Sequence, residues 1–282
     1  MKLDFLDRDL RGLLRRISRT FLAVLLAFLV SPAAHAGTKV TMEDVLVATP
    51  DGTAEATLAY PAADRKYPAV ILWPDIVGNR PIFREMARQF AAEGYVVLVP
   101  NSFYRSMRPG DAELDPWDKA TRPTLMQYRA EATDDGIARD TAAYLAFLDS
   151  QERTDTAKKA AAIGYDLGGS YAFRAAAAAP ERIAVVASVY GLGVATARPN
   201  SPHLLVPESK ADYYVAISKD DDTREPQDKD DIRKAIDQSG LEGTVEVYEA
   251  NHGWANPAAK AYDAKAADRS FQSIVALLKR DL

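Results

Sequence analysis

The sequence predicts a doubly wound α/β fold, in which helices cover both faces of a mostly parallel sheet. From residue 45 onward, strand-like apolar runs alternate with segments of helical periodicity. A helix between two such strands carries the chain back to the starting edge of the sheet, so the strands lie parallel. Hydrophobic residues make up 48% of the 282 residues, and the chain has no cysteine. We therefore expect a large core that forms without disulfides.

The first 36 residues are interpreted as a secretory signal peptide that precedes one domain, residues 37–282. Six Lys or Arg residues come before the apolar run at residues 21–30, and Ala34 and Ala36 complete an Ala-x-Ala site. These three parts are typical of such a peptide. The alternative is an uncleaved anchor, but ten apolar residues are fewer than the ~20 that a helix needs to cross a membrane. We expect export to the periplasm or the medium, without stable membrane association after cleavage.

The charge balance argues against a nucleic-acid partner, and the expected partner is a small-molecule substrate. The chain has 35 Lys or Arg and 40 Asp or Glu residues, and a formal net charge of −5. Loss of the signal peptide would remove six basic and three acidic residues, which makes the remainder more acidic. Because an acidic protein repels a polyanion, we expect no nucleic-acid partner. A monomer is favoured, although no residue pattern fixes the oligomeric state.

The first half of the expected sheet contains two edge strands and two buried strands. Residues 45–49 and 53–60 alternate in the manner of an antiparallel pair at a sheet edge. Residues 69–74 and 95–100 are continuous apolar runs, typical of strands that are buried on both faces. Between them, residues 80–94 are expected to form a helix that ends at a glycine.

The second half continues the alternation after one interruption. Residues 101–131 contain three prolines and little periodicity, so we expect a long irregular excursion of the kind that often carries substrate contacts. The remaining expected strands lie at residues 158–165, 183–190, 213–218 and 244–250, and the remaining helices at residues 134–151, 170–179, 227–238 and 267–282.

Ionisable residues follow three of the later strands. Asp166 comes directly after one strand, an aspartate run at residues 220–222 after another, and His252 after the last. In doubly wound folds the site lies at the carboxyl ends of the strands. An apex residue, an acid and a histidine in this chain order predict a hydrolytic triad. Asp221 is the expected acid and Asp222 the alternative, because the length of the turn is ambiguous.

The stretch GYDLGG has the composition of a sharp strand-to-helix turn. Gly164 and Gly168 allow the strand and the helix to pass closely, and Asp166 stands at the apex. The backbone N–H of Leu167 would point into the same space and form half of an oxyanion hole. The other half is expected from Ile76, in the loop after the first buried strand.

Four short motifs each follow an expected strand: PDIVG at residues 74–78, PNSFYR at residues 100–105, GYDLGG at residues 164–169 and NHGW at residues 251–254. Together they resemble the dienelactone hydrolase family, and the similarity runs from residue 45 to the C-terminus. The resemblance implies an α/β-hydrolase fold and hydrolysis of a small ester or lactone without a metal or cofactor. It also implies that Arg105 binds a substrate carboxylate and that Asp75 replaces a glutamate near the nucleophile.

Two positions depart from that family. Asp166 stands where the family has a nucleophilic cysteine, and Asn256 where the type enzyme has a second carboxylate-binding arginine. A carboxylate can displace a leaving group from saturated carbon, as in a haloacid or an epoxide, and form an ester that His252 and water hydrolyse. Two alternatives stay open: Asp166 as a general base, or as an inactivating replacement, paired with His252, in a small-molecule binder. His203 is expected to be structural. The expected pocket residues are Asp75, Arg105, Asp166, Asp221 and His252.

Overall fold

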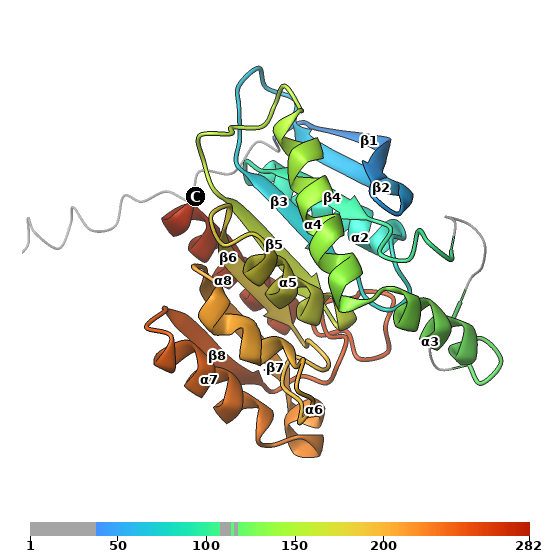
Figure 1. Cartoon of the computed structure of the whole chain (residues 1–282), viewed down its shortest axis with the longest axis vertical. Helices are drawn as coiled ribbons and strands as arrows, with labels where there is room; N and C mark the ends of the chain where they lie inside the picture. Colours follow the sequence, from blue (N-terminus) through green and yellow to red (C-terminus); the bar gives the residue numbers. More distant parts are fainter. Residues whose placement is uncertain (1–37, 108–113, 116–117) are drawn as a thin grey trace, which may run out of the picture. The chain divides into compact units, whose positions relative to one another are not determined.

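The computed structural model describes residues 38–107, 114–115 and 118–282, so the expected signal peptide lies outside the described residues. An eight-stranded sheet has the order β1-β2-β4-β3-β5-β6-β7-β8 (Figure 1). Its strands are β1 (Val40–Thr49), β2 (Gly52–Pro61), β3 (Ala69–Trp73), β4 (Val96–Pro100), β5 (Ala160–Tyr165), β6 (Ile183–Val189), β7 (Asp212–Ser218) and β8 (Gly243–Tyr248).

Strand pairing follows the predicted pattern. β1 pairs with β2, and β2 with β4, in antiparallel fashion, whereas the remaining neighbouring pairs from β4 to β8 are parallel. The antiparallel pair at one edge and the mostly parallel sheet are therefore confirmed. Because β3, β5, β6, β7 and β8 run in the same direction, the loops that follow them emerge at one edge of the sheet.

Helices cover both faces of this sheet, as predicted. On one face α2 (Pro81–Ala92) and α8 (Ala264–Asp281) bury Phe90 and Ile274 in one apolar cluster. On the other, α4 (Asp134–Asp149), α5 (Leu167–Ala178) and α7 (Asp228–Gln238) bury Tyr144, Phe173 and Ile236 in a second. In the view of Figure 1, α4 and α5 lie in front of the sheet and α8 lies behind it. No helix in the described part of the chain has the length and apolar character needed to span a membrane.

The segment expected to be irregular contains a helix. α3 (Arg122–Glu131) occupies its last third, and a proline lies in its first turn, where a missing N–H costs little. Leu125 is its one buried residue, so the helix lacks a continuous apolar face. This explains why apolar periodicity did not reveal it. Two further short helices were not expected, namely η1 (Pro202–Glu208) and α6 (Lys219–Arg224).

Candidate active site

The sharp turn expected at Asp166 is present between β5 and α5. Asp166 has a φ of 51° and a ψ of −120°, a backbone conformation that is strained for a residue with a side chain. A Cβ atom on Gly164 would lie 1.9 Å from the carbonyl oxygen of Gly168, and one on Gly168 would lie 2.3 Å from that of Trp73. Side chains at these two positions would push the strand and the helix apart. The glycines therefore permit the turn that presents the Asp166 carboxylate.

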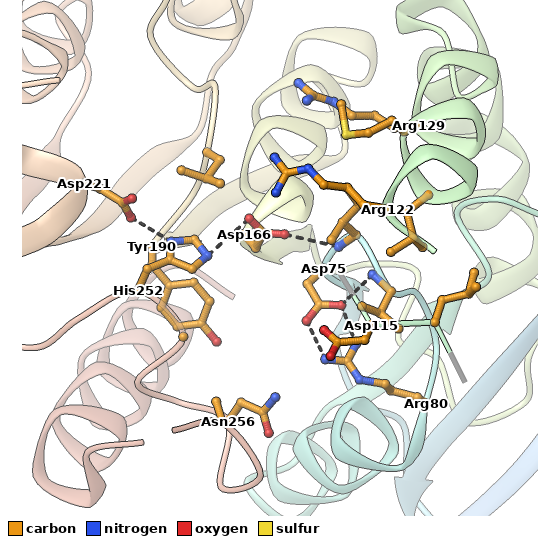
Figure 2. A pocket seen from close by; sticks show the side chains of 18 of the residues that line it. Asp75, Arg80, Asp115, Arg122, Arg129, Asp166, Tyr190, Asp221, His252 and Asn256 are labelled. Carbon is orange, nitrogen blue, oxygen red and sulfur yellow. Dashed lines mark hydrogen bonds and ion pairs between the residues drawn. The ribbon is translucent and has the colours of Figure 1, made fainter. Parts of the chain in front are cut away.

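The loops after β5, β7 and β8 bring together the three residues of the expected triad (Figure 2). The Nε2 atom of His252 lies 3.3 Å from Oδ1 of Asp166, and its Nδ1 atom lies 2.7 Å from Oδ2 of Asp221. Asp222, the alternative acid, instead pairs with Lys229 at 2.6 Å. The imidazole thus bridges two carboxylates, and Asp221 rather than Asp222 is the acid that it contacts.

Asp221 is held by its own surroundings. The carboxylate accepts a hydrogen bond from Ser218 Oγ and forms an ion pair with Arg224. The neighbouring Asp220 accepts the backbone N–H of His252 at 2.8 Å. These contacts join the short helix α6 to the loop of the histidine, so they fix the ring relative to the sheet.

The acids on either side of the imidazole determine its protonation. Burial by itself would lower the pKa of His252, but hydrogen bonds to Asp166 and Asp221 outweigh burial and raise the pKa to about 10. Burial would conversely raise the pKa of Asp221, but the hydrogen bond to His252 holds it below its ordinary value. At neutral pH these shifts favour an imidazolium at His252 and a carboxylate at Asp221. The ring of Tyr190 packs edge-on against this imidazole, with centroids 5.0 Å apart.

The two oxygens of Asp166 have different partners. Oδ1 faces His252, and Oδ2 accepts the backbone N–H of Ile76 at 3.2 Å. Ile76 is the residue expected to supply half of an oxyanion hole, so this donor is already occupied by the apex carboxylate. Leu167, expected to supply the other half, is buried and is the first residue of α5.

Asp75 lies beside this group, in an ion pair that sequence reasoning missed. Arg80 contacts both of its carboxylate oxygens, with Nη2 2.6 Å from Oδ2. Burial raises the pKa of Asp75 despite this pairing, and the nearby Asp166 adds to the increase. The sequence placed Arg80 only at the start of a helix, and no local pattern linked it to Asp75.

Arg105 is not brought to the cavity that contains the other expected residues. Its Nη1 and Nη2 atoms each lie 2.8 Å from an oxygen of Asp140, which is fully buried, and Nη2 lies 2.7 Å from Asp51. This network holds α4 against the hairpin of β1 and β2. The placement differs from the expectation that Arg105 lines the pocket, because two distant acids engage its guanidinium. His203 lies in η1, and its Nδ1 atom is 2.8 Å from Oγ of Ser201, the residue that precedes this helix.

A cavity of about 1190 Å³ opens in front of Asp166. Its lining includes the expected residues Asp75, Ile76, Asp166, Asp221 and His252, together with Asn256, the residue at the position of the family's second arginine. It also includes residues that sequence reasoning missed, namely Arg80, Tyr190, Arg122, Leu125, Met126 and Arg129. Within the described ranges, no group of three or more His, Asp or Glu side chains is arranged to hold a metal ion. A carboxylate, an imidazole and a backbone donor therefore face this cavity, an arrangement that can perform hydrolytic chemistry.

Comparison with known proteins places this geometry in a family. A model of the dienelactone hydrolase family matches residues 54–282. A carboxymethylenebutenolidase from a Pseudomonas species is 36% identical over 139 residues, which cover 49% of this chain and only 55% of that protein.

Solved structures agree on the fold. A dienelactone hydrolase-like promiscuous phosphotriesterase from metagenomic libraries has a TM-score of 0.71 at 20% identity, over 86% of this chain and 98% of that one. A dienelactone hydrolase from Anabaena variabilis has a TM-score of 0.54 at 16% identity, over 86% of this chain and 99% of that one. The fold that these structures share with this chain is the α/β-hydrolase fold.

Proposed function

Because this chain belongs to the dienelactone hydrolase family and is therefore a hydrolase, we propose that it hydrolyses a small organic substrate through an ester formed on Asp166. The observation that carries this proposal is that the two Asp166 oxygens have different partners, His252 for Oδ1 and the Ile76 N–H for Oδ2. Oδ2 occupies the backbone donor of Ile76, which a cysteine or serine enzyme would leave free for the substrate's carbonyl oxygen. A substrate that reacts at saturated carbon has no carbonyl oxygen to place there.

In the first step, Oδ1 of Asp166 attacks a saturated carbon that bears a halide or an epoxide oxygen. The new C–O bond forms as the bond to the leaving group breaks, and the leaving group takes the electron pair. A halide departs as the anion, whereas an epoxide oxygen takes a proton from the imidazolium of His252. The carboxylate needs no base for this step, because aspartate is ionised at neutral pH.

Ester formation then changes the state of His252. Asp166 loses its negative charge when it becomes an ester, and the stabilisation that this charge gave to the imidazolium is lost. After halide displacement the ring releases its Nε2 proton to solvent, and after epoxide opening it has already given that proton away. A neutral imidazole is therefore produced at the moment when a general base is needed. Asp221 keeps its charge and orients the ring through Nδ1.

In the second step, His252 takes a proton from water, whose oxygen attacks the Asp166 carboxyl carbon. The oxyanion of this intermediate forms on Oδ2, where the Ile76 N–H already lies. The intermediate collapses, the product alcohol leaves with the proton from His252, and Asp166 ionises again. The net reaction for a halide consumes one water and yields an alcohol, a halide ion and a proton.

Intact-mass analysis of a His252→Ala variant tests this proposal. Incubation with 2-chloropropanoate should leave an ester on Asp166, because departure of the halide needs no acid and the base for hydrolysis of the ester is gone. Peptide mapping should place the adduct on Asp166, and an Asp166→Asn variant should carry none. Asp222→Asn, which removes the adjacent carboxylate bound to Lys229, is the matched control and should turn over normally.

The second candidate is a small-molecule binder without turnover. It is favoured by the 3.3 Å pairing of Asp166 with His252, which would be the resting contact of an inactivated site as well. Bound ligand with neither adduct nor product, across haloacids, epoxides, esters and lactones, would support the binder and contradict covalent catalysis.

Export is proposed from residues 1–36, and N-terminal sequencing of protein from the periplasmic fraction tests it.

A further inference from the structure

One side of the active-site cavity is formed by a stripe of four residues on α3. Arg122, Leu125, Met126 and Arg129 all line the cavity. They are spaced i, i+3, i+4 and i+7, so they share one face of the helix. At a rise of ~1.5 Å per residue, the Cα atoms of the two arginines lie about 10 Å apart along the axis. The helix therefore offers the cavity a positive group at each end of a short apolar surface.

The other cations of the cavity are engaged by acids. Arg80 pairs with Asp75, and Arg224 pairs with Asp221. By contrast, neither Arg122 nor Arg129 forms a hydrogen bond or an ion pair with any side chain in the described part of the structure. In Figure 2 both guanidinium groups lie on the Asp166 side of the cavity, and Asn256 lies across it.

A guanidinium group donates several N–H bonds in one plane and accepts none, which matches an oxyanion. The two positions at which the family resemblance places carboxylate-binding arginines are not available for that task. Arg105 is paired with Asp140 and Asp51 away from the cavity, and position 256 is an asparagine. Among the described arginines that line the cavity, the two that are not paired with an acid are Arg122 and Arg129, and both lie on α3.

We propose that Arg122 and Arg129 bind an oxyanion group of the substrate while the exposed side chain of Met126, which packs beside the buried Leu125, contacts its apolar portion. This inference rests on the proposed function, since it describes the ligand of the same cavity. It defines the substrate class as an amphiphilic small molecule with one negatively charged oxygen group, held by α3 so that its reactive carbon faces Asp166.

Calorimetric titration with unreactive probes tests the inference. The probes are 4-phenylbutanoate and its uncharged analogue 4-phenylbutanamide, which carry no halide, epoxide or ester. The anion should bind at least about tenfold more tightly than the amide, since hydrogen bonds to charged groups contribute about that factor. The doubly substituted variant R122Q/R129Q should lose this preference. Arg88→Gln, on the exposed face of α2 outside the cavity, is the matched control and should retain it.

The outcomes separate this inference from the proposed function. Equal affinities for the two probes, binding of neither, or a preference that survives in R122Q/R129Q would overturn the anion site. A preference that depends on the α3 arginines, together with no covalent adduct on Asp166, would leave the anion site standing and remove the proposed chemistry. A phosphonate of similar length, titrated in parallel, shows which of the two oxyanion groups the arginines prefer.

Discussion

The clearest test of the site's electrostatics is the substitution Asp166→Asn, read out on the pKa of His252. Asparagine has the same shape as aspartate and still offers an oxygen to the Ile76 N–H, but it carries no charge. The structure attributes the raised pKa of His252 to hydrogen bonds and charge interactions with Asp166 and Asp221, acting against burial. Removing one carboxylate should therefore lower the pKa without rearranging the site.

The expected size of the change follows from these contacts. The pKa of His252 is raised from its ordinary value of 6.5 to about 10, and the hydrogen bond to Asp166 is the largest of the causes that raise it. Loss of about half of the increase would bring the pKa of His252 to about 8, which corresponds to about 2 kcal/mol of imidazolium stabilisation. This is the same change that ester formation on Asp166 produces in the proposed mechanism.

The measurement is a pH titration of the imidazole nitrogens by long-range 1H–15N NMR. The chain has three histidines, and the signal that disappears in the His252→Ala variant is that of His252. The folded-state pKa exceeds the ordinary value, so the protonated ring stabilises the fold fully below pH 6.5, and this contribution is lost as the pH rises toward 10. Urea unfolding of wild type and Asp166→Asn at several pH values should show the loss at lower pH in the variant.

Two results would refute the reasoning. One is a wild-type His252 that titrates near 6.5, which would mean that the two carboxylates do not hold a proton on the ring. The other is an unchanged pKa of His252 in Asp166→Asn, which would assign the increase to Asp221 alone. In that case ester formation could not release the base, and the second step of the mechanism would lack its trigger.

Other substitutions test the turn, the nucleophile and the paired arginine. Asp166→Cys should gain ester or lactone hydrolysis, because a thiolate leaves the Ile76 N–H free for the carbonyl oxygen of the substrate. Steady-state assays of this variant with a panel of lactones measure the gain, and no gain would contradict the prediction. Gly164→Ala should lower the free energy of unfolding by about 3 kcal/mol, since its Cβ would lie 1.9 Å from backbone. Gly240→Ala, with a φ of 67° but nothing within 4 Å of the Cβ, should cost only about 1 kcal/mol, and equal costs in urea unfolding would contradict the steric argument. Arg105→Met should lower the free energy of unfolding by about 3–5 kcal/mol, because the buried carboxylate of Asp140 loses its partner. The same variant should leave KM unchanged, and a raised KM would mean that Arg105 contacts the substrate.

The sheet could be predicted because most of its strands are short and buried on both faces. Such strands are continuous apolar runs in the sequence, and glycine and proline mark their ends. The element bounds were less accurate. β1 begins at Val40 rather than at residue 45, because its first half is only partly buried and has no apolar pattern. α8 begins at Ala264 rather than at residue 267, because Asp263 caps it by accepting the N–H of Ala266 at 3.0 Å.

The positions of Asp166, Asp221 and His252 could be predicted to converge because each follows a parallel strand. The choice between adjacent aspartates could not be settled from sequence, since it depends on α6 beginning immediately after β7. Ion-pair partners that lie far apart in the sequence also could not be predicted. Arg105 is separated from its two acids by 35 and 54 residues, and no local pattern links them. The α3 stripe begins and ends with arginine, so the apolar periodicity of the sequence did not predict an amphipathic helix there.

A carboxylate at the apex of the turn also removes the sensitivity to oxidation that a nucleophilic thiol would have in that position. A thiolate in that position would be exposed to peroxide, which converts cysteine stepwise to sulfenic, sulfinic and sulfonic acids, and the last forms are not recovered. Aspartate has no such oxidation ladder, and with no cysteine elsewhere in the chain there is no thiol to be captured in a mixed disulfide. Peroxide and thiol-alkylating reagents, which modify the nucleophile of a cysteine enzyme, should therefore leave the Asp166 carboxylate unmodified.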